Sequence, residues 1–132
     1  MKITADTNVL LRVVMSDDET QSSIATEAME SADMVAISLQ SLCELAWVLA
    51  RQYAVPRNDI AHAIRSLVDA HNVVVNRPAV DAGLMVLDEG GDFADGIIAY
   101  DGLWLGAEMF VSFDKKAVKL LSNQGLAARL LA

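Results

Sequence analysis

The sequence predicts an α/β protein in which a short parallel sheet lies between two layers of helices. Short apolar segments of strand length alternate with longer segments whose apolar residues recur at helical spacing. Each strand candidate is short and apolar, which is typical of parallel strands covered on both faces. The 132 residues contain no internal repeat, low-complexity tract or linker. We therefore expect one α/β/α sandwich domain over residues 1–132.

The strand candidates are short runs of apolar and β-branched residues. The first ends just before Asp6, and the others are 34–37, 73–75 and 109–113. The run 73–75 consists of three valines, and we expect it to be a buried strand. The segment 126–131 fits either an edge strand or a frayed helix, and its periodicity does not decide between them.

The helix candidates have apolar residues three and four positions apart, with polar caps or prolines near their boundaries. Ser38 is a candidate N-cap, and Pro56 ends the helix before it at about Tyr53. The first helix follows the turn at residues 6–8, and the others cover about 22–31, 38–53, 56–70, 78–88, 93–106 and a last segment that begins at Asp114.

Composition and charge limit the classes of function. Ten basic and 18 acidic residues give a net charge of −8, which argues against nucleic-acid binding through a broad basic face. It does not argue against a site where divalent cations neutralise clustered carboxylates. The hydrophobic share of 54% is high for this length, so we expect a partner to cover apolar surface, most simply in a homodimer.

We expect a cytoplasmic protein that does not enter a membrane. No apolar run has the length of a membrane span. Asp6 interrupts the apolar start too early for a signal peptide. The single cysteine, Cys43, rules out a disulfide framework and a thiolate metal site.

Four acidic side chains stand near the starts of helices. Asp6 and Asp114 each follow a strand candidate, and Asp95 lies one turn inside an apolar helix. Glu44 belongs to a helix that is apolar on almost every side, so we expect a buried carboxylate. Such a group must be paired, protonated or bound to a cation.

Each acid also has an explanation as part of a helix cap. The two that follow strands suit the N-cap position. Glu44 would complete a capping box if its helix began at Ser41, although Ser38 is an equally good earlier cap. We assign Asp92 mainly to an N-cap, with Asp95 in the first turn where the helix dipole favours an acid.

Helix capping explains each acid separately, but it explains the four acids together less well. The carboxyl ends of parallel strands form the edge of the sheet where ligands and catalytic groups collect, and four carboxylates meeting there would repel one another strongly. Mg²⁺, or Mn²⁺ in its place, suits a site of carboxylates and water, and such a site can activate water to attack a phosphodiester. We therefore expect Asp6, Glu44, Asp95 and Asp114 to hold one or two metal ions and to carry catalysis.

These motifs resemble the ordered acidic motifs of PIN domains, and the resemblance spans the whole chain. The segments that carry it are Asp6-Thr7-Asn8, Ser41-Leu42-Cys43-Glu44-Leu45, Asp92-Phe93-Ala94-Asp95-Gly96-Ile97-Ile98-Ala99 and Ser112-Phe113-Asp114. Within that family the sequence is most similar to VapC, the ribonuclease toxins of VapBC toxin–antitoxin pairs. The family usually has Ala where Gly96 stands, and we expect this glycine to loosen the helix start.

The resemblance implies a fold, an activity and partners. Asp6, Glu44, Asp95 and Asp114 would carry Mg²⁺, with Asn8 and Ser112 as supporting polar groups. A protein of this kind would be an endoribonuclease that cleaves RNA, commonly tRNA, as a homodimer. A small VapB-type antitoxin would inhibit it by covering the site with its C-terminal tail.

Two other classes of function fit the sequence less well than the nuclease. A phosphoacceptor receiver domain also has an acidic metal pocket, but it needs an acceptor Asp after a middle strand, where this chain has Asn76-Arg77-Pro78. An inactive PIN-like binding protein would not need all four acids. Arg12 and the pair Lys115-Lys116 lie near the acidic motifs, where they either contact phosphates or are solvated charges.

Overall fold

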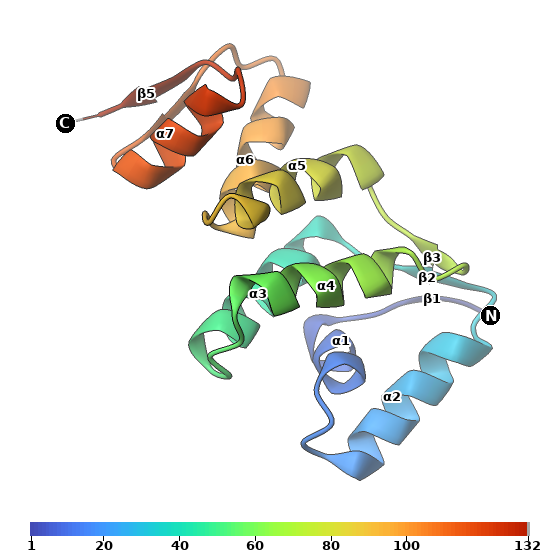
Figure 1. Ribbon diagram of the computed structural model, residues 1–132. Helices are drawn as coiled ribbons and strands as arrows, with labels where there is room; N and C mark the ends of the chain where they lie inside the picture. The colour runs from blue at the N-terminus through green and yellow to red at the C-terminus, as the bar shows by residue number, and fades with distance from the viewer. Residues whose placement is uncertain (132) are drawn as a thin grey trace. The chain divides into compact units, whose positions relative to one another are not determined.

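A computed structural model of the protein, which describes residues 1–131, confirms the α/β class with short parallel strands (Figure 1). The chain divides into two compact units, Met1–Asn76 (unit 1) and Arg77–Ala132 (unit 2). Residue 132 lies outside the described part, and the single domain over residues 1–132 stays a prediction.

Unit 1 contains a three-stranded parallel sheet and four helices. The strands lie in the order β1 (Lys2–Thr4), β2 (Met34–Ala36) and β3 (Val73–Val74). Helix α1 packs against α2 and α3, and α3 packs against α4. The helices are α1 (Thr7–Val14), α2 (Glu19–Ser31), α3 (Leu39–Arg51) and α4 (Arg57–Val68). Fully buried aliphatic side chains form the core, namely Leu10, Val35, Leu42, Leu45, Leu49 and Ile64.

Unit 2 contains three helices and a two-stranded parallel sheet. Helices α5 (Arg77–Asp88) and α6 (Phe93–Trp104) pack against each other, and α7 (Lys115–Asn123) packs on the strands β4 (Phe110–Ser112) and β5 (Ala128–Leu130). Val86, Ala99 and Leu121 form a buried cluster, and Phe110 and Leu120 pack against it.

Two glycines allow α5 and α6 to approach closely. A Cβ on Gly96 would lie 2.4 Å from the carbonyl oxygen of Ala82 and 2.7 Å from the Cα of Gly83. A Cβ on Gly83 would lie 2.6 Å from the ring of Phe93. Gly96 therefore has a packing role at the start of α6, because a larger residue has no room against the backbone of α5.

Three expectations about the strands need correction or refinement. Within residues 1–131 the strand hydrogen bonds form two parallel sheets, β1-β2-β3 and β4-β5, where one sheet was expected, because the alternation of strands and helices predicts parallel pairing but not which strands are neighbours. The valine strand β3 is only partly buried, with Val73 half-buried and Val74 55% exposed, and it stands at the edge of the three-stranded sheet of unit 1. The undecided segment near the C-terminus contains a strand, β5.

Candidate functional site

In unit 1, the turn that carries Asp6 is joined to Glu44 by a side-chain hydrogen bond. Asp6 is the N-cap of α1, and its Oδ1 accepts from the backbone N–H of Val9 at 3.1 Å. Thr7, the next residue, donates from its hydroxyl to Oε2 of Glu44 at 2.8 Å. Two of the four predicted acids are therefore held at neighbouring positions, one at the end of β1 and one on α3.

The surroundings of Glu44 differ from the sequence prediction. Helix α3 begins at Leu39 with Ser38 as its N-cap, and the Ser38 hydroxyl accepts from the backbone N–H of Ser41 at 3.1 Å. The alternative interpretation, in which Ser41 and Glu44 form a capping box, is therefore wrong. Glu44 is exposed and not buried, because the buried face of α3 lies opposite and the apolar residue Trp47, which made the helix look buried, is itself 57% exposed.

Two residues that support Glu44 were not identified from the sequence. Besides Thr7, Gln40 contacts this carboxylate, with its Nε2 3.4 Å from Oε1 of Glu44. Gln40 lies four residues before Glu44 on the same face of α3, so helical spacing was the signal that could have found it. A carboxylate has about four lone-pair positions, and these two contacts leave room for a further ligand.

In unit 2, Asp114 and Ser112 fix the turn between β4 and α7. Oδ1 of Asp114 accepts from the backbone N–H groups of Lys116 at 2.9 Å and Ala117 at 3.2 Å, so Asp114 is the N-cap of α7. The Ser112 hydroxyl accepts from the backbone N–H of Asp114 at 2.9 Å. The predicted caps at Asp6 and Asp114 are both confirmed. Within residues 1–131, the cap hydrogen bonds of both aspartates go to Oδ1 and not to Oδ2. Capping and metal binding are therefore compatible.

Asp95 is the acid with the most unfavourable electrostatic surroundings. It is half-buried in the first turn of α6. Burial raises the pKa of Asp95, and the negative charges of Asp92 and Asp114 raise it further. Asp92 occupies the predicted N-cap position of α6. Its side chain makes no cap hydrogen bond within the described residues, so the carboxylate itself does not cap the helix. Unit 2 therefore gathers negative charge around a carboxylate that is already partly desolvated.

Comparison with known families identifies the protein class. A family model described as the PIN domain matches residues 3–120. The chain belongs to the PIN domain family. The match includes all four predicted acids, and no curated protein matches the chain. PIN domains are generally nucleases and typically use divalent metal ions, which supports a hydrolase acting on nucleic acid.

The donors available in this PIN domain fit a hard divalent cation. The candidate ligands are carboxylate oxygens without thiolate or imidazole, a set that suits Mg²⁺ or Mn²⁺ rather than Zn²⁺. Crowded like charges around Asp95 are what a bound cation relieves. Within residues 1–131, no three or more His, Cys, Asp or Glu side chains form a complete metal-binding group. Asp6 and Glu44 lie in unit 1, and Asp95 and Asp114 lie in unit 2.

Other residues of the PIN domain have simpler roles. Arg12 pairs with Asp17 at 2.7 Å, and Asp17 also accepts from the Tyr53 hydroxyl at 3.1 Å, so Asp17, in the loop after α1, links Arg12 of α1 to Tyr53, which follows α3. Partial burial and the charge of Glu44 raise the pKa of Cys43 to about 11, which keeps it a thiol. His62 is exposed.

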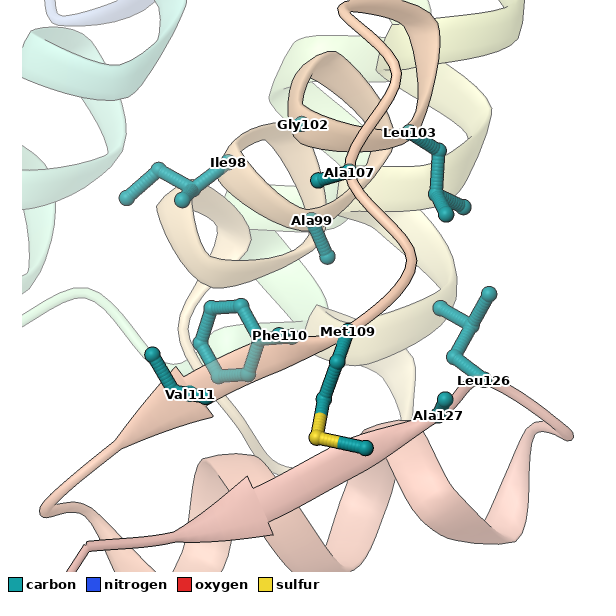
Figure 2. Close-up of a pocket in the computed structure, with 10 residues that line it drawn as sticks. All are labelled: Ile98, Ala99, Gly102, Leu103, Ala107, Met109, Phe110, Val111, Leu126 and Ala127. Atoms are coloured by element: carbon teal, nitrogen blue, oxygen red, sulfur yellow. The ribbon is translucent and has the colours of Figure 1, made fainter.

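Unit 2 of the PIN domain also has an apolar hollow of about 230 Å³ beside α6 and β4 (Figure 2). Ile98, Met109, Phe110 and Val111 are among the side chains that line it, and the lining includes no charged residue. Such a surface has no group that would bind a phosphate. No helix within residues 1–131 has the length and apolar character to cross a membrane.

Proposed function

We propose that this PIN domain is a Mg²⁺-dependent endoribonuclease toxin of the VapC kind, which cleaves RNA, and most simply tRNA. The observation that carries the proposal is Asp95, a half-buried carboxylate whose neighbours Asp92 and Asp114 are also negative. Negative charges held close together around a half-buried carboxylate do not stabilise the fold. Its retention is explained if a divalent cation is bound there during function.

The residues proposed to hold the metal are the four acids of the sequence motifs. Asp6, Glu44, Asp95 and Asp114 would hold Mg²⁺, for which Mn²⁺ could substitute. When bound, the ion supplies activation of water and stabilisation of the charge that develops on the phosphodiester. Asp6 and Asp114 each stand two residues after the end of a parallel strand, β1 and β4 respectively, and the carboxyl ends of parallel strands are where ligands collect in α/β sheets.

The surrounding polar groups would orient these ligands. The Thr7 hydroxyl and the Gln40 amide restrict the rotation of the Glu44 carboxylate, and the Ser112 hydroxyl fixes the backbone that positions Asp114. Groups of this kind set the direction of a metal ligand and tune its affinity. Asn8 is exposed on the first turn of α1, where its amide could contact the substrate.

The proposed partners follow from the same assignment. A VapB-type antitoxin with a basic tail is complementary to a chain of net charge −8. The exposed apolar side chains of α6 and the residues after it, Ile98, Leu103, Trp104 and Leu105, support a homodimer or a similar protein contact. We propose that the protein acts in the cytoplasm.

The proposal is tested by comparing the wild-type chain with an Asp6→Asn variant. Asn is as good an N-cap as Asp, so this change removes charge and leaves α1 capped. We expect wild type to arrest growth when expressed and, when purified, to cleave tRNA with Mg²⁺ but not with EDTA, and we expect Asp6→Asn to do neither. Asp59→Asn, an exposed acid on α4, serves as the matched control and should behave as wild type. Equal behaviour of wild type and Asp6→Asn would refute the toxin function.

A further inference from the structure

The C-terminal segment has a charge opposite to that of the rest of the chain. Residues 115–132 contain four basic residues and no acidic residue, whereas residues 1–114 contain six basic and 18 acidic residues. The short segment therefore carries +4 and the remainder carries −12. A charge asymmetry of this size points to an interaction with an anionic partner.

Three of the four basic residues form one exposed face on α7. We call Lys115, Lys116 and Lys119 the lysine face. All three are exposed, and they fall within about 100° of the helix circumference. Ala117 and Leu121, the buried residues of α7, lie on the opposite side. The chain has four lysines in total, so three of them gather on a single helix of nine residues.

The lysine face borders the acidic group of unit 2. Lys115 follows Asp114 directly, and the backbone N–H of Lys116 donates to the Asp114 carboxylate at 2.9 Å. The Nζ atom of Lys116 lies 3.9 Å from the position that a Cβ on Gly90 would take. This ammonium group therefore reaches the loop that leads to Asp92 and α6.

The alternative that these lysines only keep the helix surface solvated explains their arrangement less well. In a chain with 18 acids, lysines that serve only solubility have many carboxylates with which to pair. Yet none of the three lysines of this face forms an ion pair within the described residues 1–131. Helix α7 also contains no acid at a position three or four residues away. The positive charge is left available beside carboxylates that are proposed to hold the catalytic metal.

We infer that the lysine face binds backbone phosphates of the RNA strand that is cleaved beside Asp114. The inference rests on the proposed nuclease function and adds to it the surface that holds the substrate. It also explains how a protein of net charge −8 can bind a polyanion, since the basic contact is local and not spread over a broad face. The three lysines would act as point charges on phosphates and would carry no base specificity.

The inference is tested by RNA binding without cleavage. A fluorescein-labelled oligoribonucleotide of mixed sequence is titrated with the full chain in EDTA, and anisotropy is followed over a range of salt concentrations. The test variant is Lys115→Gln/Lys116→Gln/Lys119→Gln. The matched control, Lys2→Gln/Arg51→Gln/Arg129→Gln, removes three exposed positive charges from other elements. Both variants have a net charge of −11, so a nonspecific charge effect should weaken them equally.

We expect the α7 variant to bind RNA at least about tenfold more weakly at low salt and to have a salt slope smaller by about 2, since each phosphate contact to a single strand contributes about 0.7. Equal weakening of both variants, or no binding by wild type, would overturn the inference. Vesicles of phosphatidylserine and phosphatidylcholine provide a second probe. Binding to vesicles that depends more on the lysine face than RNA binding does would assign this face to a membrane surface instead.

A cleavage assay separates this inference from the proposed function. If wild type cleaves RNA with Mg²⁺ and the α7 variant has an unchanged KM, the nuclease stands and the lysine face is not its substrate contact. If the lysine face is needed for RNA binding but no divalent ion supports cleavage, the binding surface stands and the nuclease fails. Together, the inferences predict that the α7 variant raises KM and changes kcat little.

Discussion

Replacing Gly96 with alanine tests the close contact that positions the turn of Asp95. The new Cβ would lie 2.4 Å from the Ala82 carbonyl oxygen and 2.7 Å from the Gly83 Cα. Both are backbone atoms of α5, so the clash cannot be relieved by rotating a side chain. Helices α5 and α6 would have to separate by about 1 Å to restore ordinary contact.

The magnitude follows from two opposing effects. Overpacking a close contact costs about 1–3 kcal/mol, and a backbone clash belongs in the upper part of that range. Alanine is a better helix former than glycine by up to about 1 kcal/mol. We therefore expect Gly96→Ala to lower the free energy of unfolding by about 1–2 kcal/mol, which corresponds to a fall in Tm of roughly 4–8 °C for a chain of this size.

Gly102 on the same helix provides the matched control. The nearest atom to a Cβ at that position is the Cβ of Ala107, at 3.8 Å, which is an ordinary contact. Gly102→Ala should therefore show only the gain in helix propensity and raise Tm by up to about 4 °C. The assay is thermal unfolding of the two variants followed by circular dichroism. If Gly96→Ala is as stable as Gly102→Ala, the packing of α5 on α6 described above is refuted.

Three further predictions concern Thr7, Asp95 and Cys43. Thr7→Val removes the 2.8 Å hydrogen bond to Glu44 and should reduce Mg²⁺ affinity, measured by calorimetry, about 10–100-fold. Thr7→Ser keeps the hydroxyl and should retain the wild-type affinity. Equal affinities of the two variants would contradict a role of Thr7 in positioning Glu44. Asp95→Asn should stabilise the metal-free protein. Because the pKa of Asp95 is raised in the folded protein from the ordinary value of 3.8, the folded state binds this proton more tightly than the unfolded state does. The free energy of unfolding of the wild type therefore falls as pH rises from 3.8 through the folded pKa. The difference in Tm from wild type in EDTA should be near zero below pH 3.8 and grow as pH rises, and a constant difference would contradict the raised pKa. Cys43, with a pKa near 11, should react with iodoacetamide at pH 8 much more slowly than a free thiol does, and rapid alkylation would contradict its burial.

The sequence was sufficient for the features that depend on local pattern. The alternation of strands and helices predicted the α/β class, and the residues that follow β1 and β4 identified Asp6 and Asp114 as caps, which their hydrogen bonds confirm. Ser38 was recognised as a possible cap of α3 because a serine hydroxyl before a helical pattern has few other roles.

Features that depend on tertiary contacts were not predictable in the same way. Glu44 was expected to be buried because apolar composition does not distinguish a buried helix from one that exposes Trp47. The contact between Thr7 and Glu44 joins residues 37 positions apart, and the reason for Gly96 lies on another helix. The division of the strands into two sheets was not predicted, because strand order depends on tertiary contacts that local pattern does not encode.

The most direct test of the metal centre is Mn²⁺ binding to wild type, Asp6→Asn and Asp114→Asn, followed by electron paramagnetic resonance of the free ion. Asp6 belongs to unit 1 and Asp114 to unit 2, and asparagine preserves both helix caps. We predict that wild type binds one or two ions and that each single variant loses at least about tenfold in affinity. Wild-type affinity in either variant would contradict the assignment of that carboxylate as a metal ligand.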